Sequence, residues 1–235
     1  MHSRHTRVEL NIPPIKLEGS QVIPYSPSAK NLGVTFDSTL SMDGFINQKS
    51  KAAWYHLRNI GKIRPYLTAK SIEQLVHAFV TTNIDYCNSL LSGLPSTQLS
   101  KLQRIQNSAA RLITRTPKRS SITPVLRHLH WLPVEHRVTF KVLLIVFRAL
   151  TTGSPSYIRD CLLPHQPSRR LRSSDKNLLV VPTSRTKSYG DRSFQTFASY
   201  QWNSLPQSIR SSQTISSFKS KLKPHLFSRA FPDDL

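Results

Sequence analysis

Two amphipathic segments, separated by a break at Gly93 and Pro95, constrain this chain more than any other feature. Between residues 72 and 91, apolar side chains recur at helical spacing and fall on one broad face. The break at Gly93 and Pro95 is typical of a helix C-terminus. Ser96 is then placed to cap a second helix, from Thr97 to about Arg115. The apolar positions of the first segment are Ile72, Leu75, Val76, Phe79, Val80, Ile84, Cys87, Leu90 and Leu91.

The second of these helices divides into an apolar arc and a basic arc at about 100° per residue. A solvated surface and a surface for an anionic partner would both produce the basic arc. The apolar arc holds Leu99, Leu102, Ile105, Ala109, Leu112 and Ile113, and the basic arc holds Lys101, Arg104, Arg111 and Arg115.

A further basic stripe lies on a helix expected from Pro133 to about Leu150. This helix is apolar on nearly all sides, which predicts burial on several sides. The exceptions form one stripe of Arg137, Lys141 and Arg148. Between Lys101 and Arg148 the chain holds ten Lys or Arg and one acid, Glu135. Two basic stripes in one segment favour an anionic partner over solvation.

A third group of cations ends the helix expected from Ser41 to about Ile63. Arg58, Lys62 and Arg64 lie at its C-terminus, where they complement the helix dipole. These three residues could serve either to cap the helix or to bind an anion.

The flanking regions differ from this helical part. Four prolines in the first 27 residues exclude a long helix there, and a hairpin turning at Gly19-Ser20 and a strand from Asn31 to Phe36 are expected. We therefore expect the chain to divide into three regions, which are a β region at 1–40, a helical bundle at 41–152 and a looser, basic α/β region at 153–235. For the last region we expect short helices from Pro155 and Ser193, a strand at Leu178–Val181 within a basic loop at 165–192, and a final helix capped by Thr214. A short helix should also begin at Thr123.

The order of six short motifs resembles the region that follows the polymerase palm in reverse transcriptases of non-LTR (LINE-type) retrotransposons. The resemblance covers roughly residues 28–227. The motifs are Asn31-Leu32-Gly33-Val34, Asp85-Tyr86-Cys87-Asn88-Ser89-Leu90-Leu91, the segment from Leu102 to Leu112, His130-Trp131-Leu132-Pro133, Leu171-Arg172-Ser173-Ser174 and Trp202-Asn203-Ser204-Leu205-Pro206.

This resemblance implies that residues 41–152 form a thumb-like helical bundle, which grips the template–primer duplex of an RNA-directed DNA polymerase. It also implies that residues 1–40 are a remnant of the β structure of a palm, and that Leu32, Gly33 and Val34 correspond to the end of the palm, where backbone holds the primer terminus. The partners implied are RNA or an RNA/DNA duplex, and the missing palm, fingers and endonuclease parts of the parent polyprotein. An edge hairpin left from a truncated domain is the alternative for the palm-end strand.

Charge and composition agree with a polyanionic partner. The formal net charge is +21 at pH 7, which favours nucleic acid first and an anionic membrane second. Cys87 and Cys161 have no metal-ligand spacing. No signal pattern and no apolar run of about 18 residues occurs, so we expect no membrane segment and an intracellular protein, nuclear or cytoplasmic rather than secreted.

No catalytic or metal site is expected, and no cofactor. Two-metal nucleotidyl transfer needs converging carboxylates, whereas the one Asp-Asp pair, Asp233-Asp234, stands at the C-terminus without flanking strands. Asp85 is expected to pair with a neighbouring Arg. His128, His130 and His136 lack a Cys or carboxylate that would complete a zinc set.

The sequence thus predicts a mostly α, non-catalytic fragment that binds template–primer nucleic acid through basic helix faces. A helical protein-interaction module without a nucleic-acid role is the alternative. An independently active polymerase or nuclease is disfavoured because the carboxylates are missing.

Overall fold

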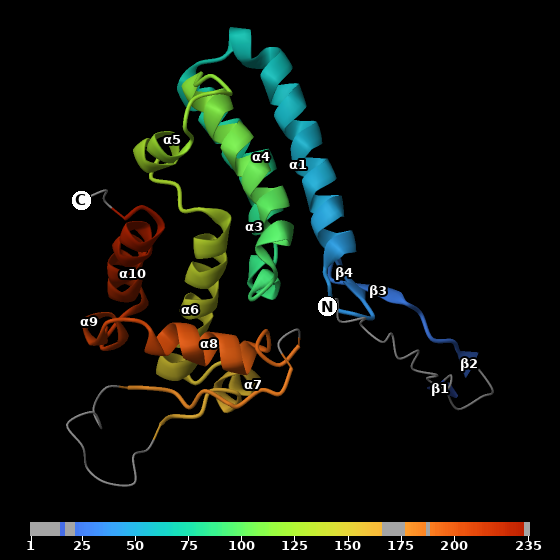
Figure 1. The fold of residues 1–235 in the computed structure, drawn as a ribbon, viewed down its shortest axis with the longest axis vertical. Coiled ribbons are helices and arrows are strands. Elements are labelled where there is room, and N and C mark those ends of the chain that lie inside the picture. Colours follow the sequence, from blue (N-terminus) through green and yellow to red (C-terminus); the bar gives the residue numbers. More distant parts are fainter. Residues whose placement is uncertain (1–14, 17–21, 166–176, 187–188, 233–235) are drawn as a thin grey trace, which may run out of the picture. The chain divides into compact units, whose positions relative to one another are not determined.

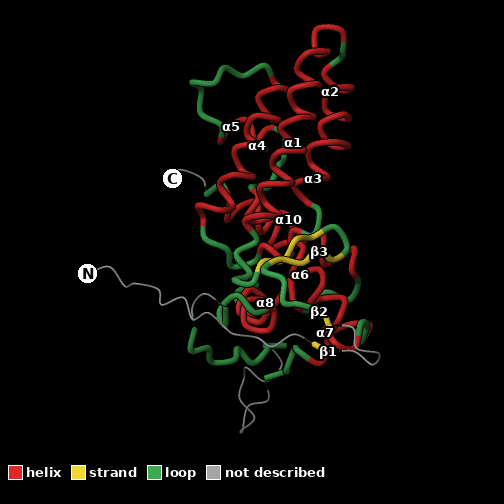
Figure 2. The backbone as a smooth tube through the Cα atoms, turned by 90° about the vertical axis from the view of Figure 1, so that its right-hand side faces the viewer, coloured by secondary structure: helices red, strands yellow, loops and turns green. Residues whose placement is uncertain are grey.

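The computed structural model describes residues 15–16, 22–165, 177–186 and 189–232. These residues are mostly helical, with two small antiparallel sheets of two strands each near the N-terminus (Figure 2). The prediction of a mostly α fold with a small β element is therefore confirmed. The chain divides into two compact units, residues 1–45 and 46–235.

The strands of the first unit form two hairpins. β1 (Ile15–Lys16) pairs with β2 (Val22–Ile23), while the predicted turn at Gly19-Ser20 lies outside the described residues. β3 (Ser28–Asn31) pairs with β4 (Val34–Asp37), and this pairing places Asn31 opposite Val34.

The turn between β3 and β4 corrects the prediction of a continuous strand from Asn31 to Phe36. Leu32 and Gly33 have φ angles of 46° and 78°. Two consecutive positive φ angles are the signature of the two-residue turn that suits the twist of a hairpin. Gly33 reaches this conformation without steric cost, so the chain reverses there instead of continuing.

The carboxylate of Asp37 organises the segment that leads from β4 into α1 (Asp43–Ile63). Its Oδ1 accepts hydrogen bonds from the backbone N–H groups of Thr39 at 3.1 Å and Ser41 at 2.9 Å, and its Oδ2 accepts one from the N–H of Met42 at 2.9 Å. Burial raises the pKa of Asp37, but hydrogen bonds from Thr39, Ser41 and Met42 outweigh burial and lower this pKa to about 2. Leu40 and Met42 both have positive φ, so this carboxylate holds a backbone that is otherwise unfavourable.

The second unit holds most of the helices (Figure 1). After α1 come η1 (Arg64–Tyr66), α2 (Ala69–Leu75), η2 (Val76–Thr81), α3 (Thr82–Asp85), η3 (Asn88–Leu91), α4 (Ser96–Thr114), α5 (Thr123–His128), α6 (Val134–Thr152), α7 (Ser156–Asp160), α8 (Phe194–Asn203), α9 (Gln207–Arg210) and α10 (Ile215–Ala230).

The segment from residue 72 to 91 is not the uniform α-helix that its periodicity predicts. η2 is a stretch of π-helix, whose wider turn rotates the following residues relative to an α-helix. Phe79 lies within this stretch and is 46% exposed, although its spacing predicts a place on the buried face. The helix ends at Asp85, Cys87 has a φ of 50°, and Leu90 in η3 is 41% exposed.

The helix expected from Thr97 to Arg115 is present as α4, but its N-terminus differs from the prediction. Pro95 occupies the N-cap position and no side chain caps the helix, so the predicted cap by Ser96 is wrong. Arg115 follows the helix with a φ of 59°. The apolar arc is buried as expected, except that Leu112 is only half-buried.

A hydrophobic core surrounds α6, which packs against α4, α7, α8, α10 and η3. The Phe147 ring on α6 stacks on Phe218 of α10 at a centroid distance of 4.3 Å, and Trp202 of α8 lies 5.9 Å from Phe218. The prediction that this helix is buried on several sides is confirmed. The sequence predicts a boundary between two regions at residue 152, and residues on both sides of this position contribute to this core.

The C-terminal helices largely follow the sequence pattern. Thr214 caps α10 by accepting a hydrogen bond from the N–H of Ser217 at 3.1 Å, as predicted. The predicted strand at Leu178–Val181 is wrong, because it is reduced to one bridge between Pro164 and Leu179. Residues 166–176 and 187–188 of the basic loop, with the motif Leu171-Arg172-Ser173-Ser174, lie outside the described residues, as does Asp233-Asp234.

Candidate nucleic-acid interface

The basic arc of α4 contains two kinds of cation. Arg104 and Arg115 are exposed. Lys101 is half-buried, and its Nζ donates a hydrogen bond to Oδ1 of Asn47 on α1 at 3.2 Å. Arg111 is also half-buried and donates from Nη2 to the carbonyl oxygen of Ser120 at 2.8 Å. Arg104 and Arg115 therefore present the charge of this arc to solvent, and the other two also tie α4 to neighbouring segments.

The basic stripe of α6 is divided in the same way. Arg137 binds Asp85 of α3, with Nε 2.9 Å from Oδ1 and a second contact between Nη2 and Oδ2. The prediction that Asp85 pairs with an arginine is confirmed, and Arg137 is the arginine. Lys141 and Arg148 are exposed. The positive charge of Arg137 is compensated by a carboxylate, so this residue contributes little to an anion-binding surface.

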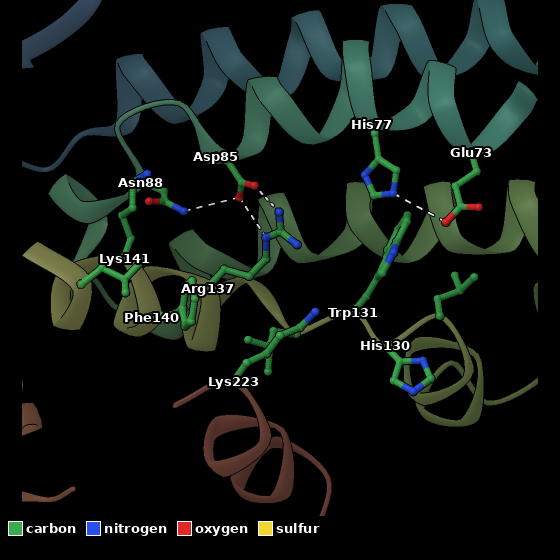
Figure 3. A pocket seen from close by; sticks show the side chains of 13 residues that line it. Glu73, His77, Asp85, Asn88, His130, Trp131, Arg137, Phe140, Lys141 and Lys223 are labelled. Atoms are coloured by element: carbon green, nitrogen blue, oxygen red, sulfur yellow. Dashed lines mark hydrogen bonds and ion pairs between the residues drawn. The ribbon is translucent and has the colours of Figure 1, made fainter. Parts of the chain in front are cut away.

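A cavity of about 520 Å³ opens beside the Asp85–Arg137 pair (Figure 3). Lys141 of α6 and Lys223 of α10 line it, together with Trp131. At its other end His77 lies 3.7 Å from Glu73 in an ion-pair geometry. Both carboxylates at this cavity thus have a nitrogen partner, whereas no acceptor for Lys141 or Lys223 is found within the described ranges. Sequence reasoning did not assign Lys223 to a site, because its place opposite Lys141 depends on how α10 packs on α6.

The cations at the end of α1 also differ from one another. Arg58 and Lys62 are exposed, and Lys62 lies in the last turn, where it complements the helix dipole. Arg64, in η1, is half-buried, and its Nε and Nη2 are buried without a hydrogen-bond partner in the part of the chain that is described.

The residues that resemble a primer grip occupy the tip of the β3–β4 hairpin. Leu32 is 85% exposed, whereas Val34 is buried. Gly33 lies between them in the turn, so the three residues do not form one extended strand. A role in holding a primer terminus stays a prediction.

Across the described residues, no group of three or more His, Cys, Asp or Glu is placed to hold a metal ion. Within the same residues, no helix combines the length and the apolar character that crossing a membrane requires. Comparison of the chain with protein-family models, curated proteins and solved structures finds no match.

Proposed function

We propose that this chain is the thumb and post-palm part of a non-LTR retrotransposon reverse transcriptase, and that it grips template–primer nucleic acid without catalysing a reaction. The six motifs in their order support the family, and the helical second unit agrees with a thumb-like bundle. The missing palm, fingers and endonuclease parts would then be its partners. Such a protein would act inside the cell, in the nucleus or the cytoplasm.

One observation carries the nucleic-acid role. Residues 96–128, which contain α4, α5 and the loop between them, hold no Asp or Glu. Arg104, Arg115, Lys118, Arg119 and Arg127 are all exposed in this segment. A surface of this kind attracts a polyanion, and binding releases the counterions that the polyanion holds.

The mechanism is neutralisation of backbone phosphates, which does not read sequence. Arg104 and Arg115 lie about 16 Å apart along the helix axis, at 1.5 Å per residue. They can therefore contact separate phosphates of one duplex. Lys118 and Arg119 in the following loop extend the same surface.

Binding of the purified chain to an RNA/DNA hybrid duplex at several salt concentrations tests this proposal. We expect an affinity that falls steeply and linearly on log–log axes, and equally for unrelated sequences. A chain that binds no duplex at low salt would contradict the proposal and favour the helical protein-interaction module.

A further inference from the structure

The solvent-facing side of α1 carries a row in which two adjacent aromatic residues are flanked by cations. We name this row the outer stripe of α1, and it consists of Lys51, Trp54, Tyr55, Arg58 and Lys62. Their spacing of three, four, seven and eleven residues from Lys51 places them on one side of a helix. All five are exposed, and Trp54 and Tyr55 are 41% and 63% exposed.

The opposite side of α1 fixes this orientation. Ala53, Leu57 and Ile60 are buried. Near one end of α1, Asn47 accepts the hydrogen bond from Lys101 of α4, and near the other end a Cβ on Gly61 would lie 3.9 Å from Leu112. α1 therefore runs alongside α4 (Figure 1), and its outer stripe faces away from the buried side.

Further aromatic side chains lie beside α1 on the flank between the outer stripe and the buried side, because His56 and Lys49 are turned roughly 140–160° around the helix from Lys51. The ring of His56 lies 5.4 Å from Tyr55 and stacks on Phe79 of η2 at 5.3 Å. Phe79 lies in the π-helical stretch and is 46% exposed. Near the start of α1, Nζ of Lys49 lies 3.9 Å from the centre of the Tyr86 ring, and Tyr86 is 40% exposed.

The charge of the stripe is not compensated locally. α1 has no carboxylate after Asp43. Lys51, Arg58 and Lys62 have no hydrogen-bond or ion-pair partner within the described ranges. An apolar protein partner would have to desolvate these cations, whereas a phosphate backbone would neutralise them.

Aromatic rings distinguish an unpaired strand from a duplex. Bases inside a duplex already stack on one another, so exposed side chains on a helix cannot reach their faces. Unpaired bases stack on aromatic side chains while cations follow the phosphates. Lys51 and Lys62 lie about 16 Å apart along the axis, a length that four to five stacked nucleotides cover at about 3.4 Å each.

We propose that the outer stripe of α1 binds an unpaired stretch of nucleic acid, with bases stacked on Trp54 and Tyr55 and phosphates held by Lys51, Arg58 and Lys62. This deepens the proposed function and rests on it, since the duplex bound through α4 would continue as a single strand over α1. The stripe therefore binds single strands in preference to duplexes, and it does not distinguish one base sequence from another.

Tryptophan fluorescence of the whole chain tests this assignment. Trp131 and Trp202 are 6% and 2% exposed, so quenching by an added oligonucleotide reports mainly on Trp54. We expect an oligothymidylate of about ten nucleotides to quench this emission, and a blunt duplex to quench it much less.

Affinity measurements on variants complete the test. Trp54→Ala and Tyr55→Ala should each weaken oligothymidylate binding by about fivefold to a hundredfold and leave duplex binding unchanged. Trp54→Phe should restore most of the affinity, because it keeps a ring. Tyr200→Ala is the matched control: Tyr200 is 64% exposed on α8, and its loss should change neither affinity.

Three results would overturn the inference. The first is that oligothymidylate does not quench the tryptophan emission. The second is that the Trp54→Ala and Tyr55→Ala variants melt like the wild type and bind single strands with unchanged affinity. The third is that these variants change the self-association of the protein instead of its binding of nucleic acid. Failure of the duplex grip is a separate result, because it would abolish salt-dependent duplex binding while quenching by oligothymidylate persists.

Discussion

The guanidinium of Arg137 on α6 binds the carboxylate of Asp85 on α3 through two nitrogens, across 52 residues of sequence. Both side chains are partly buried, with 22% and 33% of their surface exposed. The pair lies beside the cavity of Figure 3 and joins the end of α3 to α6. It makes Arg137 a structural cation, unlike its exposed neighbours Lys141 and Arg148.

A double-mutant cycle measures this pair. Asp85→Asn and Arg137→Gln should each lower the free energy of unfolding by about 1–3 kcal/mol, because each leaves a partly buried charge without its partner. The double variant should lose less than the sum of the two single losses. Glu73→Gln is the control, since its pair with His77 is exposed, and it should cost less than about 0.5 kcal/mol. Additive single losses at Asp85 and Arg137 would show that the pair is not coupled.

The carboxylate of Asp37 should titrate near pH 2. Its pKa is lowered from 3.8 to about 2, so the folded chain favours the charged form. Its contribution to stability is therefore fully present above about pH 4 and is lost as the pH falls toward 2. The carboxyl ¹³C shift of Asp37 should show this midpoint. The difference in melting temperature between wild type and Asp37→Asn should shrink over the same range, and a midpoint near 4 would count against the hydrogen-bonded geometry.

Two histidines on α6 and α10 should make the protein sensitive to mild acid. Burial lowers the pKa of both His136 and His225, and the positive charge of Arg229 lowers both further, while Glu135 partly raises that of His136. The folded chain then disfavours the protonated forms. Stability should be full above the ordinary histidine pKa of 6.5 and should fall as the pH drops below it.

Melting curves between pH 8 and 5 check this expectation. Arg229→Gln should weaken the dependence, because it removes a charge that opposes protonation of both rings. A double His136→Gln, His225→Gln variant should weaken it further. If stability is constant or rises toward pH 5 in the wild type, these two rings are not held as the structure places them.

The long helices could be predicted because each carries a strong period over many residues. α1, α4 and α6 were expected within a few residues of their observed bounds, and the capping of α10 by Thr214 follows from a local signal. The π-helical stretch in η2 could not be predicted, since it changes the phase without changing the composition. The turn at Leu32-Gly33 was missed because Leu is a rare residue at positive φ.

For the candidate nucleic-acid interface, the sequence predicts which residues are present but not the contacts that they make. The sequence identifies the cations of α4, but it does not show that Lys101 binds Asn47 or that Arg111 binds the carbonyl of Ser120, because these contacts depend on packing. The aromatic residues of the outer stripe of α1 were also missed. Their spacing from Lys51 is visible in the sequence, but their exposure is decided by which side of α1 is buried.

The salt dependence of duplex binding by an Arg104→Gln, Arg115→Gln variant tests the central claim most directly. If each arginine contacts one phosphate, the log–log slope on a B-form duplex should become shallower by roughly 0.9 per contact, or about two units in all. Folding should hardly change, because both side chains are exposed and Gln suits a helix. The control is Arg159→Gln, Arg185→Gln, which removes the same charge from exposed positions elsewhere and should leave the slope as in the wild type. A wild-type slope in the first variant, or an equal change in both, would contradict a duplex grip on α4.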